Sequence, residues 1–295
     1  MKRYIHKIKH HTKNFYHLLK PEDVVDAIIS ISAIAIISHG SISLTQIDRF
    51  ILALFYGFFL FSASIILHQY YDLGTDKINK PERPLASGKI SPRVGLYLSI
   101  IAYSLSILIS FLLGFIYLII AIFGIILSLI YSHPSHHTRR KSIILPLIVL
   151  NMGYTFITFI IGWCVYQPIS TIPLWLITFL FITDMVAVFS KDYRDYDGDK
   201  KHGYISLPIV YGYHTAAKIN VIMYVMPFVI LLSLSIVGLI PIKFGLVGLY
   251  YILSGYYAFS LLFHSTNKNY AVLCYKIITV NLILIRVLLI WVMVL

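Results

Sequence analysis

Long apolar runs constrain this chain more than any other feature. They recur from Val24 to Leu295, with short polar stretches between them. A helix that crosses a bilayer needs about 20 predominantly apolar residues, and lipid forces every backbone polar group to find an internal partner. Only 12% of the residues are charged, about half the fraction found in a soluble domain. The sequence therefore predicts an all-α, polytopic membrane protein that forms a single transmembrane domain over residues 1–295.

Nine runs are long enough to be transmembrane helices. They are preceded by residues 1–22, whose basic and aromatic residues at helical spacing predict an amphipathic helix at the membrane surface. Because many more runs follow the first one, we interpret it as a span rather than a cleavable signal peptide. The predicted spans are residues 23–40, 48–70, 93–113, 115–132, 143–166, 172–190, 215–238, 243–264 and 271–293.

The chain has 24 basic and 12 acidic residues, and the position of the bases explains their excess. With the N-terminus inside, the inner segments and their immediate flanks hold most of the lysines and arginines. This is the positive-inside pattern. It predicts an integral protein of the cell membrane whose N-terminus and polar loops are cytoplasmic and whose C-terminus is outside. Nucleic-acid binding is not expected, because the bases are spread over short loops beside apolar runs, where attraction to anionic lipid is the usual cause.

Two acidic islands interrupt the apolar pattern, at residues 68–91 and 190–203, and they contain seven of the twelve acids. Grouped carboxylates repel one another unless a cation holds them, and oxygen ligands favour a hard ion such as Mg²⁺. The alternative is a pair of solvated loops with surface salt bridges. A spacing of four residues would place two carboxylates on one helix face. This spacing occurs in both islands, between Asp72 and Asp76 and between Asp195 and Asp199. In the second island, Asp192 lies one turn before Asp195.

Basic residues flank both acidic islands. Arg83 lies in the segment PERPLASG, where prolines and a glycine predict a defined turn. An arginine held in this way suits bidentate contact with phosphate oxygens. Lys191 opens the second island, and the loop at 132–141 adds Arg139 and Arg140. An even number of spans separates the three loops, so they are predicted to lie on one membrane face. The bases of the 132–141 loop have an alternative role as a plain positive-inside anchor.

With these residues in place, the chain resembles the UbiA superfamily of intramembrane prenyltransferases. Residues 68–88, HQYYDLGTDKINKPERPLASG, are similar to the family signature NDxxDxxxDxxNxPxRPxxSG. Residues 191–208, KDYRDYDGDKKHGYISLP, are similar to the second signature KDxxDxxGDxxxGxxTLP. YSHP at residues 131–134, followed by bases, is a weaker match to the family loop YSxPPxxxK. The number and order of the predicted helices fit as well, so the resemblance covers nearly the whole chain.

The resemblance implies Mg²⁺-dependent transfer of a prenyl group from a polyprenyl diphosphate to a lipophilic acceptor inside the membrane. The second signature looks most like the branch that alkylates geranylgeranylglyceryl phosphate, and an aromatic or quinone-precursor acceptor is the alternative. Four aspartates are implied in catalysis and, together with Asp192, in metal binding: Asp72, Asp76, Asp195 and Asp199. The implied substrate-binding residues are His68, Arg83, Arg139, Arg140, Lys191, Asp192 and Tyr193.

The first signature departs from the family pattern at its start, where His68 replaces the expected Asn and Gln69 the expected Asp. A neutral imidazole is able to ligate a metal or to orient Asp72. The change also keeps two other functions open. One is a terpene cyclase that ionises the same diphosphate without an acceptor. The other is a lipid-binding or transport relative, although a transporter is expected to carry its ionisable groups at the bilayer midplane.

Two charges lie deep within predicted spans, Asp184 and Arg286. Because intramembrane charges usually face the bundle interior and find a partner, we expect these two either to pair or to line a polar chamber. The alternative for Arg286 is to extend outward to the interface. A carbocation derived from a prenyl diphosphate needs an apolar chamber with aromatic faces, and the candidates near the polar level are Tyr70, Tyr71, Tyr154 and Tyr193.

Overall fold

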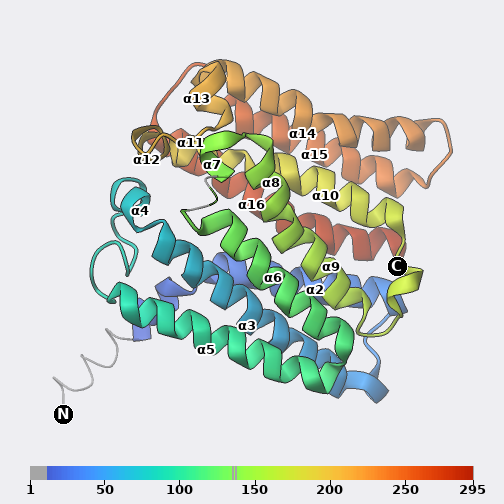
Figure 1. Ribbon diagram of the computed structural model, residues 1–295. Coiled ribbons are helices and arrows are strands. Elements are labelled where there is room, and N and C mark those ends of the chain that lie inside the picture. Colours follow the sequence, from blue (N-terminus) through green and yellow to red (C-terminus); the bar gives the residue numbers. More distant parts are fainter. Residues whose placement is uncertain (1–11, 135, 137, 295) are drawn as a thin grey trace, which may run out of the picture.

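The computed structural model describes residues 12–134, 136 and 138–294, and these residues form helices and turns without a strand. The long helices lie side by side in one bundle (Figure 1). They are α2 (Pro21–His39), α3 (Ile47–Tyr71), α5 (Pro92–Leu113), α6 (Phe115–Ser132), α8 (Ile144–Asn151) continuing into α9 (Ile157–Trp163), α10 (Leu174–Val188), α14 (Tyr213–Ile236), α15 (Ile242–Ser260) and α16 (Lys268–Met293). The short helices are α4 (Leu73–Asn79), α7 (Thr138–Lys141), α11 (Ser190–Arg194), α12 (Tyr196–Lys201) and α13 (Leu207–Tyr211), with single 3₁₀ turns at Leu44–Gln46 and Ile169–Thr171.

The all-α membrane fold predicted from the sequence is confirmed, and each of the nine predicted spans coincides with a helix. Within the described residues, seven helical segments are long and apolar enough to cross a membrane. The other two long helices are more polar, since α2 carries three acids in its first two turns and four tyrosines dilute the apolar residues of α15. The count of nine crossings therefore stays a prediction.

Local sequence signals set the helix ends near the polar loops. Ser91 caps α5 by accepting a hydrogen bond from the Val94 N–H, at 3.3 Å, and Pro92 occupies the first turn, where its missing N–H costs nothing. Gly114 separates α5 from α6 with a φ of 117°, a conformation that L side chains rarely adopt. The two predicted spans therefore meet at a glycine with no polar residue between them.

The fifth predicted span contains a wider turn. Met152–Phe156 is π-helical and joins α8 to α9. Such turns insert an extra residue into an α-helix, leave backbone groups under-satisfied and are frequent at functional sites. Here the π-helical turn directs Tyr154 and Thr155 toward the centre of the bundle, where both line a cavity.

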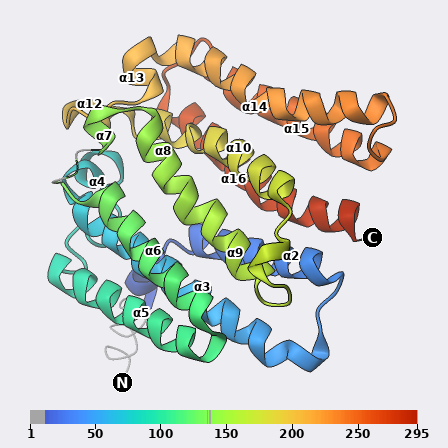
Figure 2. The same cartoon turned by 45° about the vertical axis from the view of Figure 1, so that its right-hand side comes forward.

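Two hydrophobic clusters form the interior. One joins α2, α3, α5, α6 and α9, and the other joins α10, α14, α15 and α16. Figure 2 shows α14 and α15 at one side of the bundle and α3, α5 and α6 at the other, with α2, α9, α10 and α16 between them. Helix α2 packs against both α9 and α16 and so connects the two clusters.

The polar helices α4, α7, α11 and α12 lie together at one end of the bundle (Figures 1 and 2). The predicted amphipathic helix at residues 1–22 falls partly outside the described residues. Its residues 12–18 are helical, and Leu18 is fully buried. The Gln69 amide donates a hydrogen bond to the Leu18 carbonyl at 2.7 Å, so this segment is attached to the end of α3, close to the first acidic island.

Candidate functional site

The two acidic islands have the same local construction. In each, a helix ends at an aspartate outside helical geometry, Asp72 after α3 and Asp195 after α11. A short helix then follows and carries the second aspartate one turn later, Asp76 in α4 and Asp199 in α12. The backbone repeats as well, because the Asp76 N–H bonds to the Asp72 carbonyl at 2.8 Å and the Asp199 N–H bonds to the Asp195 carbonyl at 3.1 Å. The spacing of four residues thus places each pair on one turn.

A buried asparagine joins the islands. The Asn79 side chain of α4 accepts the Gly198 N–H of α12 at 2.8 Å and donates to the Asp195 carbonyl at 2.8 Å. A Cβ atom at Gly198 would lie 2.5 Å from the Asn79 amide nitrogen. Glycine is therefore required here for the close approach of α12 to α4, and the two hydrogen bonds hold the islands in a fixed register.

Two basic side chains bridge carboxylates of the two islands. Lys80 Nζ lies 2.6 Å from Asp195 Oδ2 and 3.9 Å from Asp76 Oδ1. Arg139, from α7, donates to Asp72 Oδ1 at 2.8 Å and to Asp199 Oδ1 at 3.0 Å. All three polar loops therefore meet in one network, as the even number of predicted spans between them required.

Further basic side chains surround the network. Arg83 donates to Asp76 at 2.6 Å, Lys191 to Asp192 at 2.9 Å, and Arg194 to Asp195 at 3.1 Å. Aromatic rings fix the planes of two guanidinium groups: Arg139 lies 4.0 Å from the ring centroid of Tyr204, and Arg194 lies 3.9 Å from that of Tyr275. These arginines are held by packing as well as by charge.

The environment separates the acidities of the two aspartates in the second island. Burial raises the pKa of Asp199 to about 6, although Arg139 opposes the rise. Burial acts in the same direction on Asp195, but Lys80 and Arg194 hold the pKa of that carboxyl well below its usual range. Burial also lowers the pKa of Lys80 to about 8, against the attraction of Asp195. With these pKa values, Asp199 and Lys80 are both mainly charged around pH 7, and Asp199 gains a proton as the pH falls whereas Lys80 loses one as the pH rises.

A large cavity opens beside this network, with about 1230 Å³ of empty space, part of it open to solvent. Its polar end is formed by both islands and by α7, and its interior extends between α2, α10 and α16. The side chains at the polar end include Asp72, Lys80, Arg83, Arg139, Lys191 and Asp195. The cavity thus presents basic and acidic groups at its mouth and a wall of mixed apolar and polar side chains further in.

Deep in the cavity, Asp184 of α10 and Arg286 of α16 form the predicted pair. Both Arg286 terminal nitrogens donate to the Asp184 carboxylate, and Arg286 Nε donates to Ser30 Oγ at 3.2 Å. Thr155, from the π-helical turn, donates to Asp184 at 2.6 Å. The prediction of a mutual pair is confirmed, and the pair also lines the cavity.

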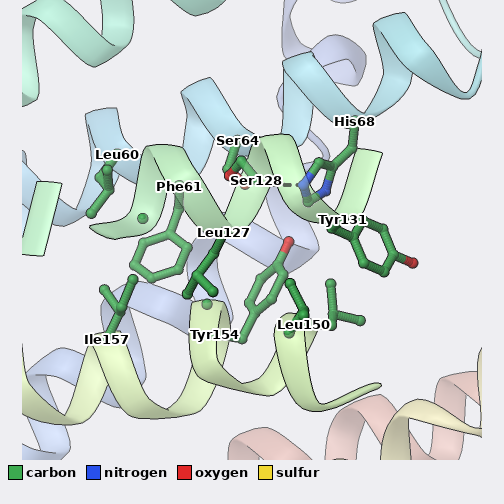
Figure 3. Close-up of a pocket in the computed structure, with 13 residues that line it drawn as sticks. Leu60, Phe61, Ser64, His68, Leu127, Ser128, Tyr131, Leu150, Tyr154 and Ile157 are labelled. Carbon is green, nitrogen blue, oxygen red and sulfur yellow. Dashed lines mark hydrogen bonds between the residues drawn. The ribbon is translucent and has the colours of Figure 1, made fainter. Parts of the chain in front are cut away.

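A smaller, mainly apolar side chamber shares a wall with the main cavity (Figure 3). It lies between α3, α6 and the α8–α9 span, and Tyr154 and Tyr131 line both spaces. His68 stands at the junction, with its ring 5.1 Å from that of Tyr131. The His68 ring is hydrogen bonded to Ser64, at 3.4 Å, and Ser64 in turn to Ser128 at 2.7 Å. Its side chain thus lines both spaces and is held by Ser64.

The structure brings most of the predicted site residues to this one network or cavity, but not all of them. Arg140 forms no ion pair with a described residue and lies 5.7 Å from the Tyr204 ring. Tyr193 is buried on the opposite side of α11, where it accepts a hydrogen bond from Asn220 and packs against Tyr213. Of the predicted aromatic lining, Tyr154 lines the cavity, whereas Tyr70 and Tyr71 pack against each other.

Several residues of the site had no part in the sequence prediction. Asn79, which joins the islands, lies inside the first signature but has no charge to draw notice. Asp23, Asp26 and Ser30 line the cavity from α2. A signal for them exists in the sequence, because acids are rare in this chain and two of these fall three residues apart at the start of a span.

The carboxylates of the network are hard oxygen donors, which are the ligands that a divalent metal ion such as Mg²⁺ prefers. Among the described residues, no three metal-binding side chains gather closely enough to hold an ion. However, Lys80 and Arg139 each place a positive charge between carboxylates of different islands. Carboxylates that share a cation in this way are the hard oxygen donors that Mg²⁺ uses, so the donor chemistry fits Mg²⁺.

Comparison with known proteins decides the family. The model of the UbiA prenyltransferase family matches residues 27–283. The chain belongs to this family. It is similar to the digeranylgeranylglyceryl phosphate synthase of Methanosphaera stadtmanae, with 30% identity over 209 residues that cover 71% of this chain and 73% of the relative.

Solved structures share the fold of this UbiA family member. A structure of a digeranylgeranylglyceryl phosphate synthase aligns with a TM-score of 0.66 and 22% identity, covering 96% of this chain and 98% of the other. A UbiA homologue from Archaeoglobus fulgidus bound to GPP and Mg²⁺ aligns with a TM-score of 0.65 and 16% identity, covering 95% of this chain and all of the other. At these identities the likeness concerns the fold.

Proposed function

We propose that this UbiA family prenyltransferase uses Mg²⁺ to transfer a geranylgeranyl group from its diphosphate to the hydroxyl of geranylgeranylglyceryl phosphate. One observation carries the proposal: both acidic islands and three groups of basic residues meet at the mouth of a single cavity, which shares a wall with a mainly apolar side chamber. A diphosphate needs positive charge around it, and the chain attached to it needs a lipid-like space. The mouth of the cavity offers the charge, and the adjoining side chamber offers the apolar space.

The charged residues at the mouth suit the departure of a diphosphate. Asp72, Asp76, Asp192, Asp195 and Asp199 would hold Mg²⁺, which would supply positive charge to the leaving oxygens. The basic residues Lys80, Arg83, Arg139 and Lys191, now bonded to those carboxylates, are in position to bind diphosphate oxygens. Stabilising charge where it develops is usually the largest contribution to catalysis. Tyr131 and Tyr154, which line the cavity, are in position to present their ring faces to the electron-poor carbon left behind.

The choice of acceptor is supported by the relatives, because the similar curated proteins are named digeranylgeranylglyceryl phosphate synthases. That product carries two geranylgeranyl groups on a glyceryl phosphate, so the acceptor is a lipid alcohol. We also propose that the polar end of the bundle faces the cytoplasm, where the charged head groups of both substrates are exposed to water at the membrane surface. The concentration of lysine and arginine in these loops supports that orientation.

The test uses purified full-length protein in lipid nanodiscs with labelled geranylgeranyl diphosphate, Mg²⁺ and geranylgeranylglyceryl phosphate. Wild-type protein is expected to form the ether, and Asp72→Ala and Asp195→Ala each to abolish it. Asp197→Ala is the matched control, because Asp197 belongs to the second island but is exposed and makes no ion pair with a described residue. Full activity in both Asp72→Ala and Asp195→Ala would refute a shared site.

Two outcomes would assign another function. A cyclic hydrocarbon formed from the diphosphate alone would identify a terpene cyclase. Protein that releases no pyrophosphate, with or without Mg²⁺ and at any prenyl chain length, would identify a lipid-binding or transport relative.

A further inference from the structure

Helix α2 presents a polar stripe to the cavity. Asp23, Asp26, Ala27 and Ser30 all line it, and their spacing of three, one and three residues is that of one helix face. The stripe begins at the mouth, where Asp23 is paired with Lys20, and ends at Ser30, which accepts the hydrogen bond from Arg286. Asp26 lies between these two paired regions, one turn inward from the mouth.

Asp26 differs from the other charged residues of the cavity wall in having no partner. Within the described chain, every other charged side chain that lines the cavity forms an ion pair, apart from Glu22, which is exposed. Asp26 Oδ1 is buried and accepts no hydrogen bond. The nearby Arg286 does not compensate, because its donors are directed to Asp184, Ser30 and the carbonyl of Leu282.

A buried carboxyl oxygen without a donor requires an explanation, since such groups in native proteins are nearly always satisfied. The diphosphate is not its ligand, because two anions would repel, and the basic residues for the diphosphate lie at the mouth. A neutral ligand that brings its own donor fits better. The acceptor in the proposed function is an alcohol, and its hydroxyl must reach the carbon next to the diphosphate from the inner side, where Asp26 lies.

We propose that Asp26 binds the hydroxyl of the lipid alcohol acceptor and takes its proton during transfer. This inference rests on the proposed function and names the residue that activates the nucleophile. A lone pair of the hydroxyl oxygen forms the new bond to C1 of the prenyl group. The bond from C1 to the diphosphate oxygen breaks, and its electron pair leaves with the diphosphate. The O–H electron pair stays on the ether oxygen, and the proton moves to the Asp26 carboxylate.

The site has a direct consequence for acceptor class. A carboxylate positioned to accept a hydrogen bond selects an acceptor that carries a hydroxyl at the reacting atom. An aromatic carbon offers no such donor before the bond forms. Asp26 therefore favours an ether product over a carbon–carbon bond. Loss of the Asp26 carboxylate is expected to leave the prenyl cation without an activated hydroxyl to attack it, while the prenyl diphosphate still binds.

The experiment compares wild type, Asp26→Asn and Asp26→Glu in the nanodisc assay, using geranylgeranyl diphosphate, Mg²⁺ and geranylgeranylglyceryl phosphate. Asp26→Asn keeps the shape of the side chain and removes the base, so kcat for the ether is expected to fall about 100-fold. Binding of the unreactive analogue geranylgeranyl thiodiphosphate is expected to stay unchanged. The share of prenyl groups lost to water as prenol is expected to rise, and Asp26→Glu to recover part of the ether.

Asp48→Asn is the matched control, because Asp48 is an exposed acid at the start of α3, far from the cavity. If wild type forms the ether and Asp26→Asn forms it at the same rate, this inference is wrong and the proposed function stands. An equal loss of turnover and of analogue binding also overturns it, because Asp26 would then serve the diphosphate or the fold. Wild-type protein that forms no ether overturns both.

Discussion

The hydrogen bonds between Asn79 and the second island allow a sharp test of how the site is assembled. In Asn79→Ala, the Gly198 N–H loses its partner in a buried contact, whereas the Asp195 carbonyl loses one of two donors and keeps the Asp199 N–H. Leaving one buried polar group unpaired costs about 1–3 kcal/mol. Because one group, the Gly198 N–H, is left without its partner, we expect a loss of about 1–3 kcal/mol.

This free energy is lost from the contact that joins the two islands, because Asn79 belongs to α4 and its partners belong to the second island. If catalysis requires the joined form, kcat/KM is expected to fall by up to about 100-fold, since about 1.4 kcal/mol corresponds to a factor of ten. Asn269→Ala, at an exposed asparagine in the first turn of α16, is expected to leave kcat/KM unchanged. The prenyl-transfer assay in nanodiscs measures both variants.

A double-mutant cycle refines the test. Gly198→Ala alone forces a Cβ atom to within 2.5–2.7 Å of the Asn79 side chain, so one of them must move. In the Asn79→Ala background that obstruction is gone, and adding Gly198→Ala is expected to cost little more. The double variant should therefore resemble Asn79→Ala alone. Penalties that simply add would show that Gly198 is needed for some other reason, and the reasoning would be refuted.

Three further outcomes are expected. Arg139→Ala should lower kcat/KM by about 100-fold, because it removes both charge-assisted contacts between the islands, whereas Lys141→Ala, at an exposed base of the same short helix, should match wild type in the same assay. Burial raises the pKa of Asp199 to about 6, so this carboxyl is ionised at neutral pH and gains a proton as the pH falls. Turnover should therefore decline through about pH 6, and excess Mg²⁺ should move that decline to lower pH by competing with the proton. A decline of turnover that begins only near pH 4, about the ordinary value for an aspartate, would contradict the assignment. Arg286→Leu should destabilise the fold by about 3–5 kcal/mol by leaving Asp184 buried and unpaired, and combining it with Asp184→Leu should restore most of the thermal unfolding midpoint in the same detergent.

The four-residue spacing inside each island is visible in the sequence because it is local. Asp72 and Asp76, like Asp195 and Asp199, lie one turn apart whatever the rest of the chain does. Their partners are different in kind. Arg139 reaches Asp72 across 67 positions and Asp199 across 60, and such pairings depend on how whole helices pack. The sequence therefore indicated which loops share a membrane face, but it did not show which cation bridges which carboxylates.

His68 illustrates the same division. Its departure from the family signature is a fact of sequence, and it left open a metal ligand or a support for Asp72. The structure shows that the imidazole Nε2 is hydrogen bonded to Ser64, which lies one turn earlier on α3 and is itself bonded to Ser128 of α6. Tyr193 was predicted to be near the substrate from its place in the second signature, yet the turn of α11 directs it into the core against Asn220.

By itself, the sequence determined that the chain is a bundle of membrane helices, that its acids and bases gather in three loops at one end, and that Gly114 separates two spans. These properties follow from hydropathy, helical period and loop parity, which need no knowledge of packing. Only the tertiary structure decided that Asn79 joins the islands and that Asp184 pairs with Arg286. It also decided that α2 brings Asp26 to the cavity wall without a partner. The physical reason is that pairing and burial depend on which helix faces meet, and those meetings join residues more than a hundred positions apart.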